Sequence, residues 1–301
     1  MQIDRNGIIV LYKPQGWTSF DVIAKARGIL STRKVGHSGT LDPMATGVLP
    51  IFMGRATKAV DMQIVKDKEY IATFQLGITT DTGDITGEVT GRRPVNCTPQ
   101  QVKEAAASFL GTITQLPPMY SAVKVNGQPL YKLARKGEVV ERKPRTAQIK
   151  SIEFMDSDEK ENLYTIKVLC SEGTYIRTLA EDIGKKLGCG AALTRLVRTS
   201  ACGYTLDQAV TLEQLQQARQ EDKIDSMIVS VDTVFSHLPS IDLSRELAVR
   251  ILNGARSRIS KPDGDYRVYY NKKFYAVANV TDKKMSVVKL FVEKEKEDLD
   301  A

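Results

Sequence analysis

The stretch 69–76 constrains the fold of this chain most, because its apolar side chains recur at every second position. Tyr70, Ala72, Phe74 and Leu76 alternate with Glu69 and other residues of mixed character, and alternate side chains of an extended chain point to the same side. This spacing predicts a strand with one strongly apolar face. We therefore expect a sheet with one face turned to a core.

Helix signals separate the predicted strands. A capping box of Thr18 and Asp21 starts a helix over 19–30, and Thr98 caps a second helix that Gly111 ends. After Gly173, apolar residues recur at helical spacing as far as Gly188, which predicts an amphipathic helix. Further predictions are strands at 7–11, 146–154 and 163–170 and a short helix at 211–219.

Two segments show neither the periodicity of a helix nor that of a strand. Residues 34–57 are rich in Gly, Pro and Thr, so we predict a long ordered loop there. Residues 117–137 are predicted to be irregular and are basic. Long loops without secondary structure inside compact domains usually carry function.

The composition indicates a globular protein that lies outside membranes. The chain has 301 residues, of which 42% are hydrophobic and 26% charged, so one large catalytic unit with a small appendage is expected. The sequence contains no apolar run near the roughly 20 residues that a membrane span needs. Residues 1–5 lack the features of a signal peptide, and we expect a cytoplasmic protein.

The charge favours a polyanionic partner. The formal net charge is +7, and the acidic segment 293–301 lowers it, so the rest of the chain is more basic still. The four cysteines stand singly and the only histidines are His37 and His237. This pattern supports neither a disulfide framework nor a structural zinc site, and we expect no metal and no cofactor.

The end of the chain has a different pattern. After a predicted linker at Leu238 and Pro239, Ser244 caps a helix that runs to Asn253. Strands are predicted at 266–270, 274–280 and 285–292, the first two joined by a tight turn at 271–273. Residues 238–292 are therefore predicted to form a small, mostly β module, followed by the acidic tail 293–301.

One motif carries a family resemblance. Residues 36–50, GHSGTLDPMATGVLP, resemble the active-site loop of the TruB family of tRNA pseudouridine synthases, in which G-H-x-G-x-L-D-P-x-A-x-G-x-L-P surrounds a catalytic aspartate. Every fixed position of that pattern is filled. The resemblance implies that Asp42 is the catalytic residue and that His37 helps to hold the region of the flipped substrate.

Further motifs extend the resemblance from Gly7 to about Arg198 in family order and spacing. They lie at 13–19, 68–72, 80–87, 117–124 and 173–180, with Lys58 after the active-site loop. By resemblance, the substrate pocket contains Asp42, His37, Tyr70, Tyr175, Arg177 and Leu196.

The resemblance implies a fold and an activity. The fold is α+β, a pseudouridine synthase fold with a mixed, largely antiparallel sheet and flanking helices, plus a C-terminal β-rich PUA-like domain. The implied boundaries are 1–237 for the catalytic domain and 238–292 for the PUA-like domain. The implied activity converts uridine 55 in the T-loop of tRNA to pseudouridine after base flipping, without a guide RNA, by an enzyme expected to be a monomer.

The chemistry needs an ionised carboxylate beside the sugar and base. Desolvation raises the pKa of a carboxylate, whereas a guanidinium lowers it, so Arg177 is the candidate that keeps Asp42 charged. Tyr70 offers a flat face to the extruded uracil and a hydroxyl for deprotonation at carbon 5, and base stacking contributes about 1–3 kcal/mol. Attack at ribose carbon 1′, addition to uracil carbon 6 and formation of a glycal remain open.

Basic side chains are candidates for the RNA backbone, where they supply salt-dependent affinity rather than sequence choice. We expect the C-terminal module to grip the acceptor side of the tRNA. The candidates for phosphate contact are Lys13, Lys58, Lys124, Lys132, Arg135 and Lys136.

Other functions stay open at this point. A guide-dependent synthase of the dyskerin type shares the aspartate loop and the C-terminal module, and an RNA-binding or tRNA-folding protein can use the same scaffold. A zinc deaminase is a poorer match, since the H-x-E and P-C-x-x-C elements are absent. The run at 188–190 lacks the third glycine of a dinucleotide fingerprint.

Overall fold

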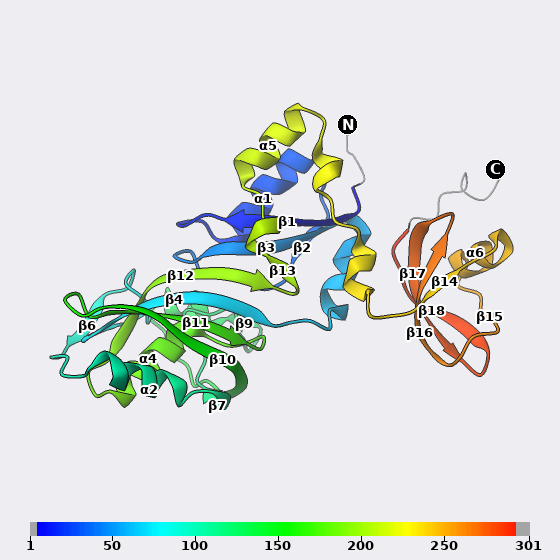
Figure 1. Ribbon diagram of the computed structural model, residues 1–301. Coiled ribbons are helices and arrows are strands. Elements are labelled where there is room, and N and C mark those ends of the chain that lie inside the picture. Colours follow the sequence, from blue (N-terminus) through cyan, green and yellow to red (C-terminus); the bar gives the residue numbers. More distant parts are fainter. Residues whose placement is uncertain (1–4, 293–301) are drawn as a thin grey trace.

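The computed structural model describes residues 5–292, so the predicted acidic tail at 293–301 lies outside the described residues. A mixed sheet of nine strands forms the larger body, and a five-stranded sheet forms a module at the C-terminal end (Figure 1). The order of the large sheet is β1 (Gly7–Lys13), β3 (Thr46–Met53), β12 (Ala191–Ala201), β4 (Lys68–Leu76), β11 (Leu163–Cys170), β10 (Arg145–Asp158) and β7 (Gly111–Gln115), with β2 (Val35–His37) beside β3 and β13 (Tyr204–Thr205) beside β12.

The pairing in this sheet is mostly antiparallel. Among its described strands, only β3 and β12 run parallel, through Val197 opposite Thr46 and Arg198 opposite Gly47. The prediction of an α+β fold with a largely antiparallel sheet is therefore confirmed.

The predicted one-sided strand is β4. Its buried side chains are Tyr70, Ala72, Phe74 and Leu76, and the residues between them are partly exposed. Helices α2 (Pro99–Ala107) and α4 (Ile176–Lys186) cover this apolar face and complete the largest hydrophobic core. The alternating pattern thus places Tyr70 on the helix-covered face of the sheet.

Strands β1 and β3 are buried on both faces. Ile9 and Leu11 face α1 (Ser19–Leu30) and α5 (Leu212–Gln220), whereas Ile8 and Val10 face the 3-10 helix η4 (Val231–Phe235) and the C-terminal module. A strand covered on both sides has no polar face, so its sequence shows no alternation.

This double burial explains a wrong prediction. The segment 34–57 is not a continuous loop, because it contains β2, β3 and the start of the 3-10 helix η1 (Gly54–Met62). Val48, Leu49, Ile51 and Phe52 form an apolar run, and Pro50 within it argued against a strand. The loop that remains, between His37 and Thr46, carries Asp42.

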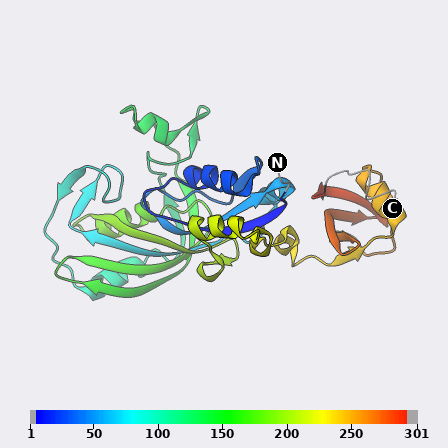
Figure 2. The same cartoon turned by 90° about the horizontal axis from the view of Figure 1, so that it is seen from above.

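The segment 117–137 is also more ordered than predicted. It contains a small hairpin and a one-turn helix and stands out from the body in Figure 2. Its elements are β8 (Lys124–Val125), β9 (Gln128–Pro129) and α3 (Leu130–Ala134). The other short elements of the body are β5 (Ile78–Thr80), β6 (Val89–Arg92), η2 (Leu206–Gln208) and η3 (Ile224–Met227).

The C-terminal module has its own hydrophobic core. Asn271 and Lys272 have φ angles of 47° and 61°, so the predicted tight turn between its first two long strands is confirmed. Its sheet has the order β14 (Ser240–Asp242), β16 (Gly264–Tyr270), β17 (Lys273–Thr281), β18 (Lys284–Leu290) and β15 (Ser257–Arg258), and α6 (Arg245–Leu252) packs beside it.

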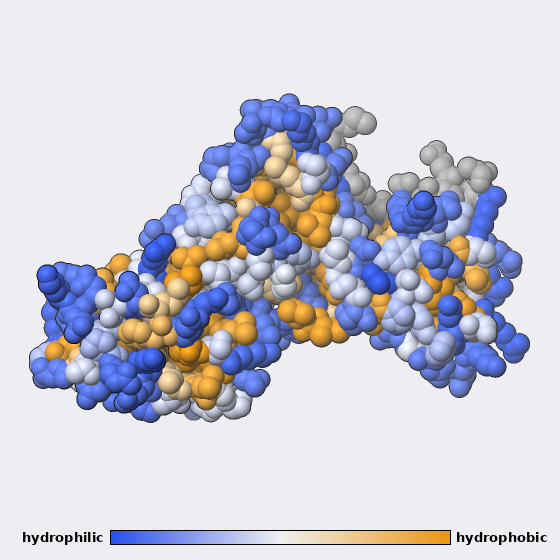
Figure 3. Space-filling model, in the orientation of Figure 1, coloured by the Kyte–Doolittle hydropathy of each residue, from blue (hydrophilic) through white to orange (hydrophobic). Residues whose placement is uncertain are grey.

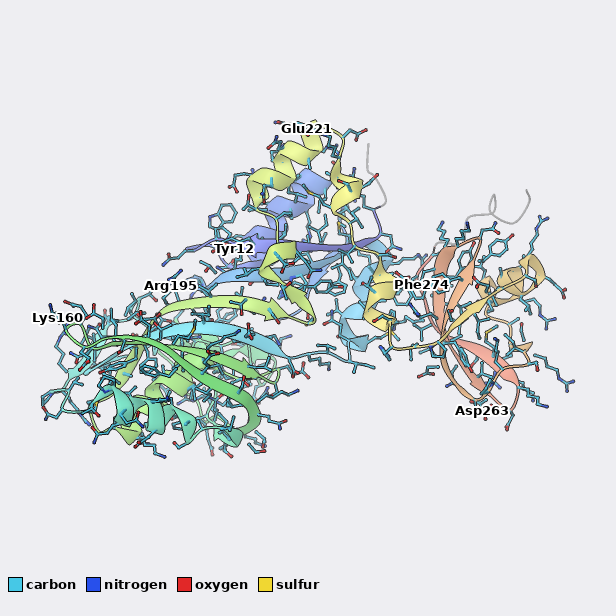
Figure 4. All side chains as sticks on the ribbon, viewed as in Figure 1. Tyr12, Lys160, Arg195, Glu221, Asp263 and Phe274 are labelled. Atoms are coloured by element: carbon cyan, nitrogen blue, oxygen red, sulfur yellow. The ribbon has the colours of Figure 1, made fainter. Side chains whose placement is uncertain are left out.

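Aromatic side chains join the module to the body. Phe274 faces η4 (Figure 4), and its ring centroid lies 5.3 Å from that of Phe291 and 5.9 Å from that of Phe235. All three belong to one core cluster with Ile8 and Phe52 of the large sheet. The module is therefore anchored to the face of β1 and β3 that lies opposite α1 and α5.

Candidate active site

Hydrogen bonds to the segment 13–19 hold the loop that carries Asp42. The Leu41 N–H donates to Ser19 Oγ at 2.9 Å, and the same hydroxyl donates to the Leu41 carbonyl at 3.2 Å. The Gly16 N–H donates to the Pro43 carbonyl at 2.8 Å. The backbone on both sides of Asp42 is thus fixed by hydrogen bonds to a neighbouring segment.

Two glycines let this loop approach the sheet. Gly47 has a φ of 108°, and a Cβ atom there would lie 2.2 Å from the Arg198 carbonyl oxygen. Gly39 has a φ of 85°, and its Cβ would lie 2.8 Å from Lys68 Cε. Because the Arg198 backbone leaves no room for a side chain at position 47, only glycine there lets β3 pair closely with β12 beside the loop, while the positive φ of Gly39 favours glycine at that turn.

Asp42 forms an ion pair with Arg177. The Arg177 Nε lies 2.8 Å from Asp42 Oδ2, and the arginine is only 4% exposed. Arg177 comes from the first turn of α4, and its other nitrogens donate to the carbonyls of Thr82 at 2.8 Å and Tyr120 at 2.7 Å. The structure thus brings these two predicted site residues into contact, and their roles in catalysis stay predictions.

A second carboxylate completes the network. Asp84 Oδ2 lies 3.7 Å from Arg177 Nη1, and Asp84 is buried. Burial raises the pKa of Asp42 above its ordinary value of 3.8, the Arg177 guanidinium lowers it, and the Asp84 carboxylate raises it, with a net upward shift. The Asp42 side chain is still 35% exposed, so an incoming substrate can reach it.

The aspartate loop adjoins the largest apolar core of the body. Tyr70 is 6% exposed and shares a core cluster with Leu196, Leu41 and Met44. Burial raises the pKa of Tyr70 to about 12, so its hydroxyl is protonated at neutral pH. Tyr70 lies close enough to Asp42 for the two groups to interact electrostatically, and the place of Leu196 in the substrate pocket stays a prediction.

Arg198 is a residue of the site that sequence reasoning missed. It is fully buried, and it donates from Nε to the Val48 carbonyl at 2.7 Å and from Nη2 to the Gly39 carbonyl at 3.1 Å. It stands opposite Tyr70 in the pairing of β12 with β4. Arg198 therefore ties both sides of the aspartate loop to β12, the neighbour of the strand that carries Tyr70. A buried arginine within a strand has no sequence signature of its own.

Tyr175 is positioned through its backbone. The side chain of buried Gln115 accepts from the Tyr175 N–H at 2.9 Å and donates to its carbonyl at 3.1 Å. This amide clamp fixes the residue before α4 and hence the start of the helix that carries Arg177. The predicted contact of the Tyr175 ring with substrate stays a prediction.

His37 lies on β2 at the entry to the aspartate loop. It is half-buried, and its Nδ1 has no hydrogen-bond partner within the described protein. Burial lowers the pKa of His37, and the Arg198 charge lowers it further, so the ring is neutral at neutral pH. Its unpartnered Nδ1 is itself buried, so a contact of His37 with the substrate stays a prediction.

The predicted phosphate contact of Lys13 is wrong. Lys13 is 0% exposed, and its Nζ donates to the carbonyls of Pro14 at 2.9 Å and Pro43 at 3.3 Å. Burial lowers its pKa to about 8, while the Asp42 carboxylate opposes this shift. Lys13 thus belongs to the floor beneath Asp42 instead of the RNA-facing surface.

The remaining predicted cations lie at the surface. Lys58 is half-buried and its Nζ donates to the Leu290 carbonyl at 2.9 Å, so it contributes to the junction with the C-terminal module. The four cations of the protruding segment are exposed, and their contact with RNA stays a prediction. They are Lys124, Lys132, Arg135 and Lys136.

The site offers no set of metal ligands. Within residues 5–292, no group of three or more His, Cys, Asp or Glu side chains has an arrangement that could hold a metal ion. None of the helices in this range is long and apolar enough to cross a membrane.

Comparison with solved structures defines the class of protein. The chain matches a crystal structure of a Cbf5-Nop10-Gar1 complex with a TM-score of 0.70 and 26% identity, covering 96% of this chain and 85% of that chain. It also shares the fold of an H/ACA ribonucleoprotein bound to a substrate RNA containing 2′-deoxyuridine, with a TM-score of 0.69, 23% identity and coverage of 96% and 86%. The fold is that of the pseudouridine synthases.

Comparison of sequences defines the family. A model of the TruB family pseudouridylate synthase N-terminal domain matches residues 27–176, and one of the tRNA pseudouridylate synthase B C-terminal domain matches 177–236. The tRNA pseudouridine synthase B of Ralstonia nicotianae is 45% identical over 271 residues, covering 88% of this chain and 86% of that protein. That of Burkholderia mallei is 44% identical over 272 residues, with coverage of 88% and 89%. This chain belongs to the TruB family of pseudouridylate synthases.

Proposed function

We propose that this enzyme converts uridine 55 in the T-loop of tRNA to pseudouridine without a guide RNA, with Asp42 as the catalytic carboxylate. The observation that carries the proposal is the Asp42–Arg177 ion pair at 2.8 Å, in which the Asp42 side chain is still 35% exposed. The names of the relatives, tRNA pseudouridine synthase B, support the substrate. The enzyme is proposed to act as a cytoplasmic monomer, with 1–237 as the catalytic domain and 238–292 as a PUA-like RNA-binding domain.

The reaction exchanges one bond to the base for another. The bond from ribose carbon 1′ to uracil N1 breaks, the base turns, carbon 5 joins the sugar, and carbon 5 loses its proton. An ionised carboxylate serves each of the three routes: attack at carbon 1′, addition to carbon 6, or removal of a ribose proton. Arg177 favours that ionised form, because a guanidinium hydrogen-bonded to a carboxylate stabilises its charge.

The base has to leave its stack before it can reach Asp42. Base flipping costs a few kcal/mol, which new contacts of the everted nucleotide offset. Tyr70 and Leu196 supply an apolar wall for the uracil, and base–aromatic stacking contributes about 1–3 kcal/mol. His37 is proposed to help hold the region of the flipped substrate.

In this proposal, Tyr70 contributes mainly through its aromatic ring. With a pKa of about 12, its hydroxyl does not supply a phenolate at neutral pH. It can accept the carbon 5 proton only if its own proton leaves in the same step. The aromatic face is therefore the main contribution of Tyr70, and the hydroxyl is secondary.

A guide-dependent synthase is the second candidate, because the solved structures with this fold include Cbf5 complexes. The identity to that chain is 26%, against 45% to a tRNA pseudouridine synthase B over 271 residues, which favours the tRNA enzyme. A role in tRNA folding on the same scaffold is compatible with catalysis and would persist in a variant that binds without turnover.

The test uses the full-length chain and an unmodified tRNA transcript with no other RNA or protein. After incubation, chemical mapping of pseudouridine is expected to report one modified position, uridine 55 in the T-loop. A transcript with cytidine at that position is the matched control and should yield no pseudouridine. Conversion that requires an added guide RNA, or that occurs elsewhere in the tRNA, would overturn the proposal.

A further inference from the structure

A small polar cavity lies beside the start of the aspartate loop. Its volume is about 280 Å³, and its lining includes a thiol, a hydroxyl, an amide and two lysines. These side chains belong to Cys202, Ser38, Gln63, Lys66 and Lys68. None of the five belongs to the predicted substrate pocket.

The Cys202 thiol touches the aspartate loop. Its Sγ lies 2.8 Å from Ser38 Oγ, and the Ser38 hydroxyl donates to Gln63 Oε1 at 2.9 Å. Cys202 has a φ of 56° in the turn between β12 and β13, and its N–H donates to the Asp67 carbonyl at 3.2 Å. Cys202 is partly exposed whereas Ser38 is buried, so a small reagent in the cavity can reach the sulfur.

The Gln63 amide is an independent sign of a missing ligand. Gln63 is 6% exposed, yet its Nε2 has no hydrogen-bond partner within the described residues. The next two residues, Ile64 and Val65, are 68% and 53% exposed, and hydrophobic residues gather over this connection from η1 to β4 in Figure 3. A buried amide beside exposed apolar side chains reverses the usual order. An atom in the cavity that accepts a hydrogen bond would satisfy Nε2.

Lys68 adds positive charge to the cavity. Its Nζ donates to the Lys66 carbonyl at 3.3 Å, and among the residues that the structure describes it forms no ion pair with an acid. Burial lowers the pKa of Lys68, the Cys202 side chain raises it and the Arg198 charge lowers it, with a net downward shift. Lys66 differs, because it pairs with Glu172 at 3.2 Å. A cation without an acid partner favours the thiolate of a neighbouring cysteine, and the thiolate is the nucleophile.

The other cysteines are poorer nucleophiles. Cys170 and Cys189 are buried, and burial raises the pKa of Cys170 to about 11. Cys97 is partly exposed like Cys202, but burial and the neighbouring Cys189 raise its pKa. A raised pKa keeps a thiol protonated and unreactive at neutral pH. Cys202 is therefore expected to react first.

We propose that Cys202 is a peroxide-sensitive thiol whose oxidation to a sulfenic acid slows turnover. The thiolate attacks one oxygen of hydrogen peroxide, the O–O bond breaks and an S–O bond forms. Sulfur gives up an electron pair, and the departing hydroxide takes the proton that the thiol released and leaves as water. The new oxygen accepts from Gln63 Nε2 and from the Lys68 ammonium. It displaces Ser38, whose neighbour His37 lies at the entry to the aspartate loop.

The first test captures the sulfenic acid in the folded, full-length protein. Hydrogen peroxide is added together with dimedone, which reacts with sulfenic acids, and peptide mass spectrometry locates the adduct. The adduct is expected at Cys202, to disappear in Cys202→Ser and to persist in the matched control Cys97→Ser. An adduct at Cys97 in its place, or at no cysteine of the native protein, would overturn the proposal. This readout needs no tRNA, so it is independent of the proposed function.

The second test concerns the charge of Lys68. Lys68→Gln should slow the labelling of Cys202 several-fold, and Lys68→Arg should restore the rate, because it returns the charge. Lys66→Gln is the matched control, since it removes a cation of the same cavity that Glu172 already neutralises. Melting temperatures show that each variant is folded. Equal labelling rates in Lys68→Gln and Lys66→Gln would contradict the proposal.

The effect on turnover is measured with an unmodified tRNA transcript in single turnover. Treatment with peroxide should slow conversion by wild type several-fold, and a thiol reductant should restore the rate, because it reduces a sulfenic acid. Cys202→Ser should keep its rate through the same treatment. Labelling of Cys202 with an unchanged rate would overturn the link to turnover. Failure of the proposed function gives a different result, since wild type would then convert no transcript before treatment.

Discussion

Asp42 is the residue on which opposing electrostatic effects converge. Burial and the Asp84 carboxylate disfavour its ionised form, whereas the Arg177 guanidinium favours it. The outcome is a carboxylate with a raised pKa that remains exposed enough to meet a substrate. A raised pKa also makes the ionised carboxylate more basic than an ordinary aspartate, which suits a group that bonds to a sugar, a base or a proton.

This balance predicts the pH dependence of turnover. Activity needs ionised Asp42, so the rate falls as pH decreases through its pKa, and the midpoint lies above the ordinary 3.8. Asp84→Asn removes the repulsive charge and should move the midpoint to lower pH. Arg177→Gln removes the stabilising charge and should move it to higher pH. The measurement is the single-turnover rate against pH, and shifts of the same sign in both variants would contradict this account.

Tyr70 provides a second prediction at this scale. Tyr70→Leu removes the aromatic face and should lower kcat/KM by roughly 5- to 150-fold, the equivalent of about 1–3 kcal/mol of stacking. Tyr70→Phe keeps the face, so it should keep tRNA binding and reduce activity only through the missing hydroxyl. Melting temperatures of both variants control for misfolding. A Phe variant as impaired in substrate binding as the Leu variant would rule out stacking.

Residues of the candidate site could be predicted from the sequence where a family motif surrounds them. Asp42 and Arg177 lie far apart in the chain, and only the family resemblance placed them together. Arg198 and Gln115 were missed because each holds backbone carbonyls or amides of other segments, and such hydrogen bonds leave no local pattern. Lys13 was assigned to RNA from its charge, although the fold buries it.

Elements were predicted best where polar and apolar residues alternate or where a cap marks an end. The predicted strand at 163–170 and the helix at 19–30 have the bounds of β11 and α1, and the capping box of Thr18 is present. Strand β10 extends past the predicted 146–154 to Asp158, with an irregularity in its pairing between Phe154 and Asp156. Strand β3 was missed since burial on both faces removes alternation.

The protruding segment 117–137 carries a prediction at the scale of elements. Its base touches the site, because the Tyr120 carbonyl accepts from Arg177. Replacing its four exposed cations with Gln should lower the slope of log K against log salt for tRNA by about 0.9 for each phosphate that these cations neutralise. The variant is Lys124→Gln, Lys132→Gln, Arg135→Gln and Lys136→Gln combined.

The control for this variant changes exposed lysines elsewhere on the body. Lys103 lies on α2 and Lys160 at the tip of the β10–β11 hairpin (Figure 4), and neither is a candidate for RNA contact. Their replacement by Gln should leave the slope within error of wild type. A slope that is unchanged in the fourfold variant would show that the segment does not contact phosphates.

At the scale of the whole molecule, the aromatic junction makes the two parts depend on each other. Phe291 is buried between Phe274 of the module and Phe235 of the body, so Phe291→Ala should destabilise the protein by about 3–5 kcal/mol. Val288→Ala, at an exposed position of the preceding strand β18, is the control. Denaturant unfolding measures both, and a destabilisation below about 1 kcal/mol for Phe291→Ala would disprove the anchoring.

The central claim is that Asp42 performs the isomerisation in a tRNA-binding enzyme. The most direct measurement compares wild type with Asp42→Asn in single-turnover conversion of an unmodified tRNA transcript, alongside the dissociation constant of each for the same RNA. The account predicts pseudouridine from wild type alone, with dissociation constants that agree within a few-fold. Pseudouridine formed by Asp42→Asn at a rate near that of wild type would contradict it.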